Sequence, residues 1–210
     1  MKREEKNQQM RRRIMDSALA EFSGQSYGAS SVNNICSAQG ISKGIIYHYF
    51  KTKDELFLAC VKECFSLLTA YISERMQQGE GTARERLEQY FTCRMAFFAS
   101  HPIYQRLFCE AIVSPPEHLS AEIQNCRREF DALNIGILEQ ILAQLPLRKD
   151  HTKEEIIEIF RQFQDFINAR YSAADLQGSE FKLHENQCRK ALNILLFAIL
   201  PNIASGLVTE

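Results

Sequence analysis

The segment Lys-Gly-Ile-Ile-Tyr-His-Tyr at residues 43–49 gathers hydrogen-bond donors and flat rings in a helix too short to need them for its own stability. The ammonium group of Lys43 could reach a guanine edge or a phosphate, and Ile45 could pack on a thymine methyl group. Gly44 omits a side chain where a helix would press against DNA. The three aromatic residues that end the segment could donate hydrogen bonds to phosphates while their rings cover sugars. The segment therefore has the chemistry of a surface that reads double-stranded DNA.

Two short helices joined by a tight turn are predicted to position this segment. Ser31 precedes a predicted helix at 32–38, and its hydroxyl can accept a backbone hydrogen bond from that helix. Gly40 follows as a terminator that tolerates a left-handed backbone. Ser42 then caps the second helix, which is expected over 43–50. Such an arrangement is typical of a helix-turn-helix, in which the second helix lies in the major groove and the first crosses the DNA backbone.

Apolar residues on both short helices could form a small core that sets the angle between them. We expect a supporting helix on each side, over about 6–22 and from about 52 to 76. The predicted core residues are Ile35, Ile41, Ile46 and Phe50.

The stretch from residue 27 to residue 57 resembles the DNA-binding region of the tetracycline-repressor (TetR) family of one-component bacterial regulators. The motif positions, in order, are Ser31, Gly40-Ile41-Ser42-Lys43-Gly44, Tyr47-His48-Tyr49-Phe50, Lys51-Thr52-Lys53 and Asp54-Glu55-Leu56-Phe57. The match covers about fifty residues. Two departures are visible: Cys36 stands where the family usually has alanine, and His48-Tyr49 reverses the commoner order of aromatic residue and histidine.

The resemblance implies two kinds of DNA contact. Phosphate anchoring would fall to Ser31, Ser42, Tyr47, Tyr49 and Lys53. Base reading would fall to Lys43, Gly44, Ile45 and His48. The alternatives are that the two serines serve as helix caps, that Tyr47 belongs to the core, and that Lys53 is a solvated surface charge.

The resemblance also implies a homodimer on a palindromic operator, in which the last two long helices pair with those of a second copy in a four-helix bundle. The apolar series on these helices suits that role, although a place in the chain's own core remains open. The predicted interface residues are Ile156, Phe160, Phe163, Ile167, Leu192, Leu195, Leu196, Ile199 and Ile203.

A small-molecule effector is expected between the fourth and eighth helices. The candidate lining residues are chosen because they are large, mostly aromatic and central, although such a stripe can equally be plain core. They are Phe97, Phe98, His101, Tyr104, Phe108 and Phe130. Because these helices show no cluster of charges, we expect an apolar or aromatic effector, whose family-typical action is to release the DNA.

Composition predicts an all-α fold. The chain has 210 residues, 45% of them hydrophobic, and only 9 glycines and 5 prolines. We expect a three-helix helix-turn-helix domain over residues 6–52 and a larger helical ligand-binding and dimerisation domain over residues 53–210. Residues 1–53 hold nine Lys or Arg against four Asp or Glu, whereas the whole chain has a formal net charge of −1. A basic head on an acidic body suits a phosphate-binding module, although charge alone decides nothing.

Seven scattered cysteines without CxxC pairs predict reduced thiols in a cytoplasmic protein, with no metal and no cofactor. The charged N-terminal stretch does not resemble a secretory signal. The C-terminal apolar run contains two Asn and a Pro, so we interpret it as a buried interface helix and expect no membrane partner.

An enzyme and a helical adaptor are the two alternatives to a DNA-binding regulator. An enzyme would need a convergent polar site, and we find no phosphate loop, HExxH pair or nucleophile elbow, so no catalytic residue is assigned. A helical adaptor would keep the head but bind protein in place of DNA. Duplex binding that weakens steeply with added salt distinguishes the regulator from the adaptor.

Overall fold

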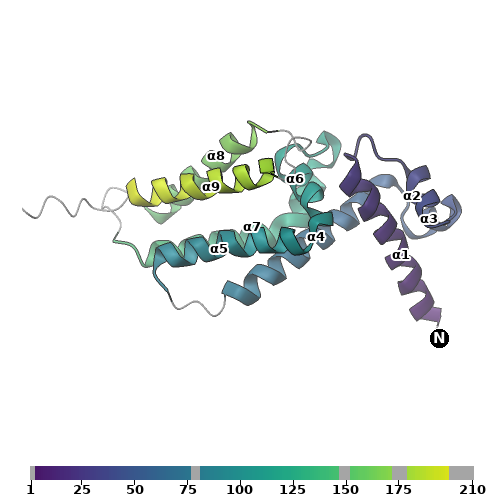
Figure 1. Cartoon of the computed structure of the whole chain (residues 1–210), viewed down its shortest axis with the longest axis horizontal. Coiled ribbons are helices and arrows are strands. Elements are labelled where there is room, and N and C mark those ends of the chain that lie inside the picture. The colour runs from purple at the N-terminus through teal and green to yellow at the C-terminus, as the bar shows by residue number, and fades with distance from the viewer. Residues whose placement is uncertain (1–2, 77–80, 147–151, 172–178, 199–210) are drawn as a thin grey trace, which may run out of the picture.

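We describe a computed structural model of the chain over residues 3–76, 81–146, 152–171 and 179–198. Every regular element among these residues is helical, which confirms the predicted all-α fold. Figure 1 shows an elongated molecule, with the first three helices clustered at one end and the long helices of the body running to the other.

The head consists of α1 (Arg3–Gly24), α2 (Val32–Ala38) and α3 (Lys43–Tyr49). The hydroxyl of Ser17 on α1 donates to the carbonyl oxygen of Ile35 on α2 over 2.6 Å, which ties the two helices together. All four predicted core residues of the head are buried, including Ile46 of α3 and Phe50 just after it. The buried residues therefore fix the angle at which α3 leaves the head.

The predicted caps of the two short helices are confirmed. The backbone N–H of Asn33 donates to the Ser31 hydroxyl over 3.1 Å, and the backbone N–H of Ile45 donates to the Ser42 hydroxyl over 3.3 Å. Gly40 has a φ of 63°, in the left-handed region that side chains with a Cβ disfavour. Local sequence thus determines where each short helix begins and how the turn between them bends.

Helix α4 (Lys53–Met76) is the central element of the fold and packs against α1, α5, α6 and α7. Nine of its residues are buried, among them Phe57, Phe65 and Ile72. It is the one helix of the described chain with the length and apolar composition of a membrane span. Its apolar residues lie against the four neighbouring helices, so the core of this fold accounts for that composition.

The body surrounds α4 with longer helices (Figure 1). In chain order these are α5 (Ala83–Ser100), the short η1 (Pro102–Tyr104), α6 (Gln105–Val113), the short η2 (Glu117–Leu119), α7 (Ser120–Ala143), α8 (Lys153–Asn168) and α9 (Ser179–Ala198). A capping box at Thr82 opens α5, and another at Thr152 opens α8. At Thr52, before α4, only half of a capping box forms: the Thr52 hydroxyl accepts the backbone N–H of Glu55, but the Glu55 carboxylate accepts the backbone N–H of Lys51 in place of that of Thr52.

Candidate nucleic-acid interface and effector pocket

Helix α3 presents most of its predicted DNA-binding residues to solvent. Lys43, Gly44 and His48 are exposed. Ile45 is 39% exposed and Tyr47 is 40% exposed, which is unusual for large apolar side chains in so small a head. Tyr47 is therefore not a core residue, and this outward face is open to a partner.

Gly44 is not required by the protein's own packing. A Cβ built at this position would meet nothing closer than the Ser42 hydroxyl at 4.0 Å, and the backbone there is ordinary right-handed helix. A larger residue would fit the isolated chain. The absence of a side chain at this point is consistent with a close approach of the α3 backbone to DNA.

Tyr49 lies differently from its neighbours. It is half-buried, and its hydroxyl donates to the side-chain oxygen of Asn7 on α1 over 2.8 Å. The ring of His48 lies edge-on to the ring of Tyr49, with centroids 5.2 Å apart. Tyr49 therefore holds the end of α3 against α1, and any phosphate contact would use the second hydrogen-bonding capacity of its hydroxyl.

Ser31 and Ser42 cap their helices by accepting backbone hydrogen bonds. A hydroxyl that accepts in this way can still donate, so capping and phosphate binding are compatible. Ser42 is exposed, whereas Ser31 is half-buried.

Lys53 is engaged by the head itself. Its ammonium group donates to the carbonyl oxygens of Tyr27 and Ser30 over 2.6 and 3.1 Å. It also lies 4.1 Å from the centroid of the Tyr27 ring. Lys53 thus fastens the loop between α1 and α2, and the predicted phosphate contact, which stays a prediction, would have to use its remaining N–H.

The same loop is fastened to the body by Glu110 of α6. Its two carboxylate oxygens accept the backbone N–H of Tyr27 over 2.8 and 3.1 Å. The Tyr27 hydroxyl in turn donates to Asp54 at the start of α4. Tyr27 therefore joins the head to two helices of the body. A movement of α6 would displace the loop that precedes α2.

Burial raises the pKa of the Glu110 carboxyl above the 4.5 of an unperturbed glutamate, while the Tyr27 N–H, Arg106 and Lys53 oppose that rise. Its stabilising contribution is therefore complete below pH 4.5 and is lost as the pH rises through the raised pKa.

Glu110→Gln keeps a carbonyl acceptor for Tyr27 but removes the titration. We expect the free energy of unfolding of this variant, relative to wild type, to increase with pH in urea titrations from pH 4 upwards. A constant difference would contradict this, and Glu117→Gln, at an exposed site, is the control.

The six predicted effector-lining residues do lie together, but they are packed against one another. The Phe98 and Phe108 ring centroids are 4.8 Å apart, and the stacked Phe97 and His101 rings are 4.8 Å apart. Phe130 approaches Phe108 at 6.0 Å, and the Tyr104 hydroxyl donates to Glu63. None of the six is among the residues that line the four pockets of the described residues for which a lining is known.

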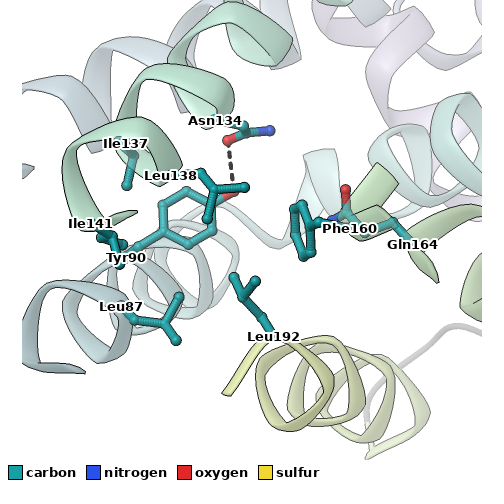
Figure 2. A pocket seen from close by; sticks show the side chains of 9 residues that line it. All are labelled: Leu87, Tyr90, Asn134, Ile137, Leu138, Ile141, Phe160, Gln164 and Leu192. Atoms are coloured by element: carbon teal, nitrogen blue, oxygen red, sulfur yellow. Dashed lines mark hydrogen bonds between the residues drawn. The ribbon is translucent and has the colours of Figure 1, made fainter. Parts of the chain in front are cut away.

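A small pocket, with a cavity volume of about 20 Å³, lies instead between α5, α7, α8 and α9 (Figure 2). Most of its lining is aliphatic or aromatic, and its hydrogen-bonding groups are the Tyr90 hydroxyl and two side-chain amides. The Tyr90 hydroxyl donates to Asn134 Oδ1 over 2.7 Å. The full lining is Leu87, Tyr90, Asn134, Ile137, Leu138, Ile141, Phe160, Gln164 and Leu192.

A buried charged network behind Tyr90 corrects the expectation of helices without a charge cluster. Arg94 of α5 donates to the Glu185 carboxylate of α9 over 2.9 Å and to the Tyr90 hydroxyl over 3.1 Å. Arg94 is 5% exposed and Glu185 is 2% exposed. Ninety-one positions separate the two residues in sequence, so only folding brings them together. The sequence signal that could have indicated this network is the position of Arg94, which lies on the same helical face as Tyr90 and Phe98.

Four of the buried cysteines are held as protonated thiols. Burial raises the pKa of the Cys109 and Cys188 thiols to about 12, which keeps them protonated. Cys60 and Cys64 are also buried, and burial raises their pKa values further. Within the described ranges, no three His, Cys, Asp or Glu side chains lie together as metal ligands would.

The predicted dimer residues differ in how far they are exposed. Ile156, Ile167, Leu192 and Leu196 are buried within the chain, and Phe160 and Leu195 are half-buried. Phe163 is exposed, whereas Ile199 and Ile203 lie outside the described residues.

The exposed apolar residues of α8 form a stripe that the sequence analysis missed in part. We call Ile159, Phe163 and Phe166 the α8 stripe; they recur at the spacing of one helical face. Phe166 is 60% exposed, and Ile194 on the neighbouring α9 is 68% exposed. The predicted interface includes Phe163, but its other residues on α8, Ile156, Phe160 and Ile167, lie on the adjacent face of the helix.

These observations define a class of protein: a helix-turn-helix regulator with a helical body. Residues 14–60 match the family model for bacterial regulatory proteins of the tetR family, and residues 82–202 match the tetracyclin repressor-like C-terminal domain. The second match alone covers more than half of the chain. The chain belongs to the tetR family of transcriptional regulators, which confirms the resemblance seen in the sequence.

Known relatives agree with this assignment. The chain is 23% identical over 195 residues to IcaR, a negative transcriptional regulator of a biofilm operon in Staphylococcus aureus, covering 89% of this chain and 99% of IcaR. It is 30% identical over 79 residues to the transposon Tn10 TetC protein of Escherichia coli, covering 37% of this chain and 40% of that protein. Its fold resembles that of the transcriptional regulator FadR from Bacillus subtilis, solved in complex with stearoyl-CoA, with a TM-score of 0.66 and 17% identity over 88% of this chain and 96% of FadR.

Proposed function

We propose that this regulator is a homodimeric cytoplasmic repressor that binds a palindromic operator through α3 and releases it when a small molecule binds in its helical body. The observation that carries DNA binding is the outward face of α3, where Ile45 and Tyr47 are exposed while Ile46 and Phe50 hold the helix in place. A rigid helix with donors and apolar groups facing outward suits the major groove.

Dimerisation is supported by the α8 stripe. Aromatic side chains that are 37% and 60% exposed on one helix, beside the exposed Ile194 of α9, form an apolar surface that a second copy would cover. Two-fold pairing through the same face is the commonest way for identical chains to associate. Two copies would present two recognition helices to one palindrome.

Release by an effector is supported by the packing of α7 and by the contacts of Tyr27. Helix α7 belongs to the helical body, and it has more contacts with α4 than with any other element of the described chain. Helix α4 begins at Lys53 and Asp54, which both bind Tyr27 in the head. A shift of α7 would therefore reach the head through α4.

Selection of bound sequences from random duplexes, repeated with Lys43→Ala, tests this function. Lys43 is exposed and makes no side-chain hydrogen bond or ion pair within the described chain. If it reads a base, we expect the preferred operator to change and the affinity for the original site to fall about 10-fold or more. The matched variant Lys62→Ala, at an exposed lysine of α4, should change neither. Absence of duplex binding by the wild type at low salt would contradict the proposal and favour a protein-binding adaptor.

A further inference from the structure

We propose that the first turns of α1 form a second DNA-binding element, in which Arg3 and Lys6 bind phosphates beside the groove that receives α3. We call residues 3–10 the α1 arm. This inference rests on the proposed function and deepens it, because it takes α3 as the element that docks on the duplex. Neither Arg3 nor Lys6 belongs to the helix-turn-helix, and both precede residues 14–60, which match the family model.

The α1 arm contributes almost nothing to the core of the protein. Residues 3–9 are all charged or carry amides, and all of them are exposed. Met10 is half-buried, and the first fully buried residue of α1 is Ile14. Figure 1 shows this end of α1 projecting away from the rest of the molecule. Because helices in proteins gain most of their stability by packing an apolar face, an arm without one favours a role outside the chain's own core.

The cations of the arm lie on the side of α1 that faces the helix-turn-helix. Four residues recur at intervals of three, four and three, the spacing of one helical face: Arg3, Lys6, Met10 and Arg13. Arg13 donates to the carbonyl oxygen of Gln39, in the turn between α2 and α3, over 3.3 Å. Arg13 thus marks the side of α1 nearest to that turn, and Lys6 and Arg3 continue the same side toward the N-terminus.

A hydrogen bond holds the arm beside the end of α3. The hydroxyl of Tyr49, the last residue of α3, donates to Asn7 Oδ1 over 2.8 Å. Arg3 is one helical turn before Asn7, or about 6 Å further along α1. The outward surface of α3 therefore continues onto the arm without a break.

Both cations of the arm are free to bind an anion. Arg3 and Lys6 are exposed and make no side-chain hydrogen bond or ion pair within the described residues. Arg12 of the same helix, by contrast, is bound by Asp16 and Glu63, 2.5 and 2.6 Å away. The charge of Arg12 is thus already used by the protein, whereas the charges of Arg3 and Lys6 are not.

The arm's acidic residues do not neutralise this face. Glu4 and Glu5 are one and two positions after Arg3, which places them on other sides of the helix. The face toward the helix-turn-helix is therefore cationic. A duplex that receives α3 in its major groove presents phosphates along the edges of that groove, so an element beside α3 meets phosphates before base edges. Arginine and lysine bind phosphates through charge-assisted hydrogen bonds.

Salt titrations of duplex binding by the full chain test the inference. Each phosphate contact adds about 0.9 to the steepness with which log K falls against log salt concentration, and a dimer carries two copies of each residue. We expect Lys6→Gln to reduce this slope by about two, and Arg3→Gln to do the same. Lys6→Arg should keep the slope. The affinities for the operator and for an unrelated duplex should fall by the same factor, because phosphate contacts read no base.

Gln8→Glu is the matched control. It lowers the net charge by one, as Lys6→Gln does, at an exposed position of the same arm but on the other side of the helix. Glutamine and glutamate are both good helix formers, so both variants should keep the arm helical, which circular dichroism checks. Gln8→Glu should reduce the slope much less than Lys6→Gln. Equal reductions would overturn the inference, because general repulsion would then account for both, and so would an unchanged slope in both Lys6→Gln and Arg3→Gln.

The wild-type titration separates this inference from the proposed function. A wild-type protein that binds no duplex at low salt would refute the proposed function. A wild-type protein that binds its operator, with the same salt dependence in Lys6→Gln and Arg3→Gln, would refute the inference alone and leave α3 as the DNA-binding element.

Discussion

Replacing Arg94 with methionine is expected to lower the free energy of unfolding by about 3 to 5 kcal/mol. The variant would leave the Glu185 carboxylate buried at 2% exposure without its cation, 2.9 Å away in the wild type. It would also remove the donor to the Tyr90 hydroxyl, which lines the pocket. Urea denaturation followed by circular dichroism measures the loss.

The double variant Arg94→Met with Glu185→Leu distinguishes two causes of the lost stability: an unpaired buried carboxylate and poor packing of the new methionine. When both charges are replaced by apolar groups, no buried charge is left alone, so much of the lost stability should return. Arg75→Met, which breaks a contact of 3.1 Å with the exposed Glu74, should cost less than about 1 kcal/mol. A loss for Arg94→Met as small as that control would show that the buried pair contributes little.

Replacing Phe166 with glutamate is expected to abolish dimers and to weaken binding to a full palindrome by about 100-fold or more. Phe166 is 60% exposed, so the isolated chain should tolerate the charge, whereas a second copy packed on the α8 stripe could not. The large effect on DNA follows because two linked recognition helices bind far more tightly than one. Sedimentation velocity and duplex titration measure the two consequences.

Ser66→Glu introduces the same charge at an exposed polar position of α4, outside the α8 stripe, and is the control for that experiment. Circular dichroism should show that both variants keep their helix content. If Phe166→Glu remained dimeric with unchanged operator affinity, the α8 stripe would not be the interface, and the outward apolar face of α9 around Ile194 would be the next candidate.

The helix-turn-helix could be predicted closely because its signals are local. The hydroxyls of Ser31 and Ser42 bind backbone N–H groups two and three residues further on, and Gly40 adopts the left-handed turn within its own backbone. Such interactions depend on residue types at fixed short spacing, which a sequence displays directly. The exposure of Ile45 and Tyr47 also follows from the short period of a helix whose other face is buried.

The effector pocket could not be predicted in the same way. The six central residues with large side chains were reasonable candidates, but the structure packs them against one another, and the space lies around Tyr90 and Asn134 instead. Whether a cluster of rings closes or leaves a cavity depends on how α5, α7, α8 and α9 pack, and helical periodicity gives only the face of each helix.

Sequence alone thus determined the helical class, the caps, the recognition helix and the family, because each is encoded by neighbours a few positions apart. Only the tertiary structure decided that Lys53 binds the Tyr27 loop and that Arg94 meets Glu185. Contacts between residues tens of positions apart depend on the packing angles of whole helices. Those angles are set by the summed burial of many side chains, which no short motif records.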